Sequence, residues 1–128
     1  MKIILKNNSL IKEIGLQDFD EVAKSEKPYI IKFTNSTCHL CKELKPIFEE
    51  IAEEFKQNFK FGNVNSKKER QLFNMFKIDG VPEIFIIYND NIINMSYPDK
   101  PDPKSGYSKQ YIIDHLNEFL QSEYMGGC

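Results

Sequence analysis

The stretch Ser36-Thr37-Cys38-His39-Leu40-Cys41-Lys42 lies between an apolar run, residues 29–33, and a long helical pattern. Residues three positions apart in the first turn of a helix face the same way, so the thiols of Cys38 and Cys41 can form a disulfide there. Cys38 would lie at the helix N-terminus, where free backbone N–H groups and the helix dipole stabilise an anion. Because the thiolate is the attacking species in disulfide exchange, this placement predicts dithiol chemistry with Cys38 as the nucleophile.

A single C-x-x-C pair has two other interpretations, which are metal binding and a pair of unreactive core cysteines. The only further cysteine is Cys128, so a closed zinc site would need His39, His115 or a second chain. The polar residues 35–37 before the pair indicate an exposed turn rather than a core. We therefore predict redox chemistry with no metal and no other cofactor. Metal or iron–sulfur binding across a dimer remains the alternative.

Composition places the chain among ordinary globular domains. It has 128 residues, 41% of them hydrophobic and 28% charged, which is enough for one domain with a substantial core. We expect a single domain over 1–128, with a lead-in at 1–9 and a tail at 125–128. The net charge of −2 gives no basic surface for nucleic acid.

The first residues do not resemble an export signal. The apolar run in 1–6 is short, Asn7 and Asn8 interrupt it, and no small-residue cleavage site follows. No stretch approaches the ~20 apolar residues that cross a bilayer, and we see no retention signal. We expect a cytoplasmic protein with no membrane partner, in a reducing compartment where a C-x-x-C pair is more often catalytic than structural.

Hydrophobic periodicity predicts an alternation of strands and helices. The expected strands are a short opening strand within 10–14 (after an apolar run at 2–6), then 29–34, 59–65, 83–88 and 92–96. The expected helices are 18–23, 38–58 with Pro46 inside it, 66–76 beginning at a capping box formed by Ser66 and Glu69, and 109–124. Residues 89–91 predict a hairpin turn, and 97–107 form a proline-rich loop. This order predicts an α/β fold whose mixed central sheet has parallel strands, an antiparallel hairpin and helices on both faces.

These residues together resemble the thioredoxin family, and most of all a single catalytic domain of the protein disulfide isomerase type, over roughly residues 14–120. The resemblance rests on Lys27-Pro28, the stretch 38–42, Pro46, the stretch 78–82 and the final hairpin and helix. It implies a thioredoxin fold, with Cys38 as the attacking cysteine and Cys41 as the buried resolving one. It also implies that Pro82 is a cis proline that packs against the disulfide and presents the backbone of Val81 to an extended substrate.

Two departures from the family pattern lie within the C-x-x-C stretch. Thr37 replaces the usual tryptophan, which removes an aromatic surface and affects which substrates dock. His39-Leu40 replaces the usual Gly-Pro or Gly-His, so the histidine follows the first cysteine instead of preceding the second. A protonated His39 could stabilise the Cys38 thiolate and make the site more oxidising; alternatively, it is an exposed imidazole of little effect.

A third departure is Lys32, which lies in the central strand where the family usually has a buried acid that shuttles the proton of the resolving cysteine. A buried lysine has a lowered pKa, so it could take that proton when neutral or stabilise a thiolate when charged. Alternatively, only its stem is buried and its amine reaches water.

Two further features are candidates for substrate selection or redox chemistry. Tyr97 and Tyr107 flank the loop that borders the substrate groove in this fold, so we expect them to help select the substrate, unless they only hold the loop in place. Cys128 is a spare surface thiol, an intermolecular disulfide site or a third redox cysteine.

The sequence therefore predicts a monomeric thiol–disulfide oxidoreductase. It would exchange the Cys38–Cys41 pair with disulfides or thiols of protein substrates. No flavin or nicotinamide site is visible, so a reductase, an oxidase or glutathione would have to recycle it. The alternative is a thioredoxin-fold binding or scaffold module in which the cysteine pair is vestigial or regulatory.

Overall fold

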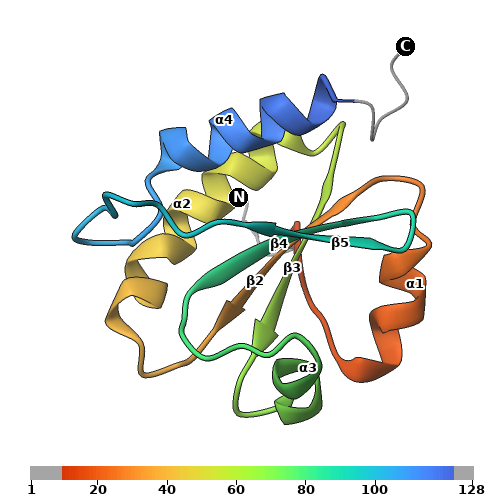
Figure 1. The fold of residues 1–128 in the computed structure, drawn as a ribbon, viewed down its shortest axis with the longest axis horizontal. Helices are drawn as coiled ribbons and strands as arrows, with labels where there is room; N and C mark the ends of the chain where they lie inside the picture. Colours follow the sequence, from red (N-terminus) through yellow and green to blue (C-terminus); the bar gives the residue numbers. More distant parts are fainter. Residues whose placement is uncertain (1–9, 123–128) are drawn as a thin grey trace, which may run out of the picture.

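A mixed five-stranded sheet forms the centre of the protein, a computed structural model that describes residues 10–122 (Figure 1). The strands of this part of the chain are β1 (Ile11–Glu13), β2 (Tyr29–Thr34), β3 (Lys60–Asn65), β4 (Glu83–Tyr88) and β5 (Asn91–Met95). Their order across the sheet is β1-β3-β2-β4-β5. β1, β3 and β2 are mutually parallel, whereas β4 is antiparallel to β2 and β5 is antiparallel to β4. The predicted parallel strands with an antiparallel hairpin are confirmed.

Helices cover both faces of this sheet. α2 (His39–Phe55) and α4 (Lys109–Leu120) lie on one face, and α1 (Phe19–Ala23) and α3 (Arg70–Met75) lie on the other (Figure 1). A short 3₁₀ turn, η1 (Leu16–Asp18), leads into α1. The predicted thioredoxin fold, an α/β sheet with helices on both faces, is therefore confirmed.

Strand β2 lies at the middle of the sheet, and all six of its residues are buried. Ile30 belongs to the apolar cluster beneath α2 and α4. Ile31 and Phe33 belong to the cluster on the α1 and α3 face. A strand buried on both faces needs apolar residues at consecutive positions, which explains its nearly continuous apolar run.

The capping box predicted at Ser66 is wrong. The backbone carbonyl and side-chain oxygen of Asn65 organise this turn, because they accept hydrogen bonds from the N–H groups of Lys68 and Lys67 at 3.2 and 2.8 Å. The helix begins only at Arg70. The carboxylate of Glu69 instead accepts a hydrogen bond from the backbone N–H of Leu16 at 3.1 Å, so it joins this turn to η1.

The other boundaries differ by a few residues at each end. The predicted helix 38–58 begins at His39 and ends at Phe55, and the helix predicted at 109–124 ends at Leu120. The predicted hairpin turn is confirmed, since Asn89 and Asp90 have the positive φ angles of 53° and 66° that such turns require. The predicted lead-in at 1–9, the tail at 125–128 and Cys128 lie outside the described residues.

Candidate active site

The turn before α2 is held by one side chain, that of Asn35. Its Oδ1 accepts hydrogen bonds from the backbone N–H and the hydroxyl of Thr37, both at 2.9 Å. Its backbone carbonyl accepts a hydrogen bond from the N–H of Cys38 at 3.1 Å. The polar stretch 35–37 is therefore a self-bonded turn that fixes the direction in which Cys38 enters the helix.

Cys38 is the N-cap residue of α2, as the sequence predicts. Its sulfur accepts a hydrogen bond from the backbone N–H of Cys41 at 3.1 Å. The residue is partly exposed, and no disulfide joins it to Cys41 in this structure. Free N–H groups at a helix N-terminus favour a negative charge. The Cys38 sulfur is therefore both accessible to a substrate and placed where a thiolate can attack a disulfide.

Cys41 occupies the opposite kind of environment. Only 5% of the residue is exposed. Burial, followed by the hydrogen bond to Cys38, raises the pKa of the Cys41 thiol to about 12. One sulfur of the pair is thus open to a partner and the other is kept protonated inside.

The loop before β4 lies against the exposed sulfur. The Val81–Pro82 peptide bond is cis, as the resemblance implies, and Pro82 is buried. The sulfur of Cys38 lies 3.8 Å from the carbonyl oxygen of Val81. A Cβ added to the neighbouring Gly80 would meet nothing within 4 Å, so the loop faces open space at this residue.

Lys32 is buried beneath α2. Only 5% of it is exposed, and its amine donates a hydrogen bond to Oδ1 of Asn63 at 2.7 Å and lies 5.3 Å from the centre of the Phe48 ring. Burial lowers the pKa of Lys32 to about 8, against an opposing effect of the Glu13 carboxylate and the Cys41 thiol. Of the interpretations left open by the sequence, the structure favours a buried amine of lowered basicity.

Two polar residues that the sequence analysis did not select complete the surroundings of Lys32. Asn63 lies directly opposite Lys32 on β3, and Glu13 lies directly opposite Asn63 on β1. The amide nitrogen of Asn63 donates to the two carboxylate oxygens of Glu13 at 3.3 and 3.4 Å. Asn63 Oδ1 also accepts a hydrogen bond from the hydroxyl of Thr34 at 2.9 Å. We call Glu13, Asn63 and Lys32 the polar row.

The polar row opens into a groove beside α2. The groove has a volume of about 980 Å³, and its lining includes Cys41 together with all of the polar row. The buried thiol and the buried amine thus share one solvent-accessible space, although no direct hydrogen bond joins them. A proton can pass between such groups through a water molecule.

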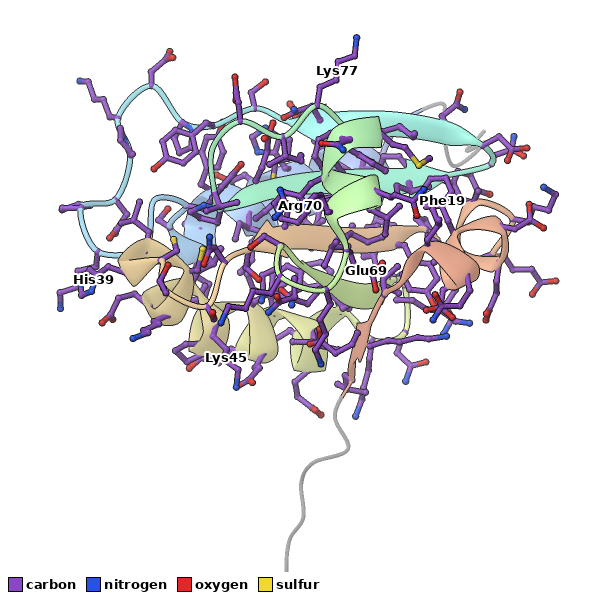
Figure 2. The ribbon with its side chains drawn as sticks, turned by 90° about the horizontal axis from the view of Figure 1, so that it is seen from below. Phe19, His39, Lys45, Glu69, Arg70 and Lys77 are labelled. Carbon is purple, nitrogen blue, oxygen red and sulfur yellow. The ribbon has the colours of Figure 1, made fainter. Side chains whose placement is uncertain are left out.

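His39 and Thr37 are both exposed. Figure 2 shows the His39 side chain directed outward at the start of α2, away from the sheet. The Thr37 hydroxyl is used by the turn at Asn35, so the residue that replaces the family's tryptophan takes part in local structure.

Of the two tyrosines expected to select substrate, Tyr107 cannot touch one. It is fully buried, and its hydroxyl accepts a hydrogen bond from the N–H of Ile84 and donates one to the carbonyl of Met95, at 3.2 and 3.3 Å. The expectation of direct contact is therefore wrong for Tyr107, which holds the loop 97–107 to the hairpin. Tyr97 is 42% exposed and packs edge-on against Tyr107, with 5.2 Å between ring centres.

Two general observations apply to residues 10–122. In this part of the chain, no group of three or more His, Cys, Asp and Glu side chains is arranged to hold a metal ion. Nor does any helix in the same range have the length and apolar character needed to cross a membrane.

The fold and the cysteine pair together define a class, that of thioredoxin-fold proteins with a C-x-x-C pair at the start of the helix after the central strand. The sequence profile of the Thioredoxin family matches residues 11–106. The chain belongs to the thioredoxin family, and its similarity to thioredoxins and protein disulfide isomerase-like proteins supports a family of thiol–disulfide oxidoreductases.

Individual relatives agree with this assignment. The chain is 33% identical over 79 residues to protein disulfide isomerase-like 2-3 of Oryza sativa subsp. japonica, a match that covers 61% of this chain and 18% of that protein. It is 29% identical over 110 residues to the thioredoxin of Buchnera aphidicola subsp. Schizaphis graminum, covering 85% of this chain and 95% of that protein. The crystal structure of the J-Trx1 fragment of ERdj5 superimposes with a TM-score of 0.74 at 22% identity, over 88% of this chain and 53% of that one. The chain thus spans under a fifth of the isomerase relative and nearly the whole of the thioredoxin.

Proposed function

We propose that this protein is a thiol–disulfide oxidoreductase that acts on protein substrates. The Cys38 thiolate attacks a substrate disulfide, and one substrate sulfur leaves while the other stays bonded to Cys38. Cys41 then attacks Cys38, which releases the substrate as a dithiol and leaves Cys38 and Cys41 as a disulfide. In the reverse direction the same steps introduce a disulfide into a substrate.

The observation that carries this proposal is the contrast between the two sulfurs. Cys38 is partly exposed at a helix N-terminus, and Cys41 is buried within hydrogen-bonding reach of it. A partly exposed sulfur at a helix N-terminus suits the attack on a bulky substrate. A shielded thiol cannot meet that substrate first and so suits the second, intramolecular step.

The substrate would lie along the loop before β4. The carbonyl of Val81 lies beside the Cys38 sulfur, and Gly80 leaves the adjoining space open. We propose that an extended substrate segment pairs with the backbone of Val81, next to Pro82, and that Thr37 and Tyr97 contact its side chains. A separate reductase, oxidase or glutathione would restore the dithiol after each turnover.

Reduction of insulin disulfides by a thiol reductant tests this function. Wild-type protein should accelerate insulin reduction, and Cys38→Ser should abolish the acceleration. Cys41→Ser should accumulate a mixed disulfide on Cys38, which mass spectrometry detects. Cys128→Ser is the matched control, because it removes a thiol outside the C-x-x-C pair and should keep the activity.

A scaffold with a vestigial cysteine pair gives a different result. In that case wild-type protein and Cys38→Ser would reduce insulin equally slowly, and no mixed disulfide would form in Cys41→Ser. That outcome would reject the oxidoreductase proposal.

A further inference from the structure

The buried cysteine poses a chemical problem that the attacking cysteine does not. Cys41 must lose its proton to attack the mixed disulfide, yet burial raises the pKa of its thiol to about 12. At neutral pH very few Cys41 thiols ionise unaided, so a nearby base would accelerate this step. The groove behind Cys41 is where such a base must lie.

We propose that the amine of Lys32 accepts the proton of Cys41 when Cys41 resolves a mixed disulfide, and that Asn63 and Glu13 are positioning residues that hold this amine in place. This inference rests on the proposed function and assigns one step of it. It gives a role to the polar row, three polar residues paired side by side across neighbouring strands.

Geometry selects Lys32 from the groups that line the groove. It is buried with Cys41 in the same space, and Asn63 fixes its amine at 2.7 Å while Glu13 fixes Asn63 from the other side. By contrast, the Lys45 side chain, which also lines the groove, is 69% exposed and pairs with the half-exposed carboxylate of Glu49. A base that is held in place transfers protons more effectively than one on a mobile side chain.

Burial and the surrounding charged groups set the pKa of the Lys32 amine close to neutral pH. Burial is the largest effect and lowers the pKa of Lys32 to about 8; Glu13, Cys41 and Glu49 act to raise it, and Lys45 acts to lower it further. On the remaining side, β4 places the apolar Ile84 opposite Lys32. With this pKa, about a tenth of the protein carries a neutral amine at pH 7, whereas an ordinary lysine would be almost wholly charged.

The step balances as follows for a substrate held on Cys38. The S–H bond of Cys41 breaks, and its electron pair forms the bond to the Cys38 sulfur. The bond from Cys38 to the substrate sulfur breaks, and that sulfur leaves with the electron pair as a thiolate. The proton passes through groove water to the neutral amine of Lys32, which becomes an ammonium. Two electrons move from the cysteine pair to the substrate disulfide.

A symmetrical aromatic disulfide, 5,5′-dithiobis(2-nitrobenzoate), separates the two steps in one experiment. In a Cys128→Ser background, the first coloured thiolate reports attack by Cys38 and the second reports resolution by Cys41. This aromatic thiolate leaves without needing a proton, so the second phase reports the ionisation of Cys41. We expect its rate to rise with pH and to level off near pH 8, the pKa of Lys32.

Substitutions at Lys32 distinguish a base from a fixed charge. Lys32→Met should slow the second phase by on the order of 100-fold at pH 7 and remove the bend near pH 8, with the first phase little changed. Lys32→Arg keeps the positive charge but cannot accept a proton, so it should be as slow as Lys32→Met. The control Lys68→Met makes the same change at an exposed position in the turn before α3 and should leave both phases unchanged.

The positioning residues have a readout of their own. Because the Glu13 carboxylate raises the pKa of Lys32, Glu13→Gln should move the bend to lower pH, and Glu13→Asp should restore it. Asn63→Leu should slow the second phase, because it removes the acceptor that holds the amine.

The outcomes separate this inference from the function beneath it. A wild-type protein without a first phase would refute the oxidoreductase proposal itself. A normal first phase with a second phase that is equally fast in Lys32→Met would overturn only the role of Lys32. A fast second phase in Lys32→Arg alone would overturn proton acceptance in favour of charge stabilisation.

Discussion

Replacing Lys32 with methionine should stabilise the protein at neutral pH. A pKa lowered from 10.5 to about 8 by burial corresponds to about 3 kcal/mol against the charged form of the buried amine. Methionine has a similar length and fills the space beside the Phe48 ring without a charge. The substitution therefore removes most of this unfavourable free energy.

The Lys32→Met substitution also removes one hydrogen bond, which offsets part of this stabilisation. The Lys32 amine no longer bonds to Asn63 Oδ1, but that oxygen keeps the hydroxyl of Thr34 as a donor at 2.9 Å. Because the acceptor stays satisfied, the loss is about 1 kcal/mol. The expected net gain in the free energy of unfolding is about 2 kcal/mol at pH 7.

The gain should depend on pH with a definite sign. In wild-type protein the unfolded chain holds the Lys32 proton up to its ordinary pKa of 10.5, and the folded chain releases it above about 8. The stability of wild type therefore rises with pH between these values, and the advantage of the methionine variant shrinks over the same range. Cys41, whose pKa is raised to about 12, titrates in both proteins and largely cancels in their difference.

Urea denaturation at pH 7, 8.5 and 10 measures this difference. We expect Lys32→Met to be more stable at pH 7 and to have no advantage at pH 10, close to the unfolded pKa of 10.5. Lys68→Met, the same change on an exposed residue, should differ from wild type by less than ~0.5 kcal/mol at each pH. A Lys32→Met variant that is less stable at pH 7, or whose advantage does not change with pH, would refute the buried, weakly basic amine.

Three further predictions concern residues around the site. Tyr107→Phe should lower the free energy of unfolding by roughly 1–3 kcal/mol in urea denaturation, because a buried hydroxyl that bridges two strands is lost. The control is Tyr97→Phe at a more exposed position, and an equal loss of stability in both variants would contradict the role of the Tyr107 hydroxyl. His39→Leu should change the rate of Cys38 alkylation by less than about threefold between pH 6 and 8, since the imidazole is exposed and solvent screens its charge. A larger change in this rate would show that His39 stabilises the Cys38 thiolate. Asn35→Ala should lower the free energy of unfolding by about 1 kcal/mol and slow the alkylation of Cys38. Asn35→Asp keeps an oxygen that accepts the hydrogen bonds of Thr37, so it should restore both the stability and the alkylation rate. An Asn35→Ala variant with unchanged stability and alkylation rate would show that the turn forms without this side chain.

The parts of the fold that the sequence predicted well have a local physical cause. The continuous apolar run of β2 follows from burial on both faces, and the hairpin at 89–90 follows from residues that tolerate positive φ. The long, regular helical pattern after Cys38 predicts the N-terminal position that this residue has in α2. Each of these features leaves its mark on a short, continuous stretch of residues.

The errors involve contacts between distant segments. Glu69 fits a capping box locally, but its carboxylate bonds to Leu16 instead. Tyr107 fits an exposed loop by composition, but its hydroxyl reaches Ile84 and Met95 in the hairpin. The partners of these side chains are fixed by tertiary structure, which local pattern does not encode.

Glu13 and Asn63, the partners of Lys32 in the polar row, cannot be recognised from local pattern for the same reason, although the row has a clear signature once the strand register is known. The face of the sheet beneath α2 begins with the paired apolar residues Ile11, Phe61 and Ile30 and continues, two residues further along each strand, with Glu13, Asn63 and Lys32. Strands β1, β3 and β2 are parallel, so their carboxyl ends meet at one edge, where α2 begins and Cys41 is buried. The same three strands therefore form apolar core at one end and a polar site at the other. A core alone has no use for a lysine in this place, because a well-packed apolar residue would be more stable there. The proposed transfer of the Cys41 proton to Lys32 would account for an amine in this place.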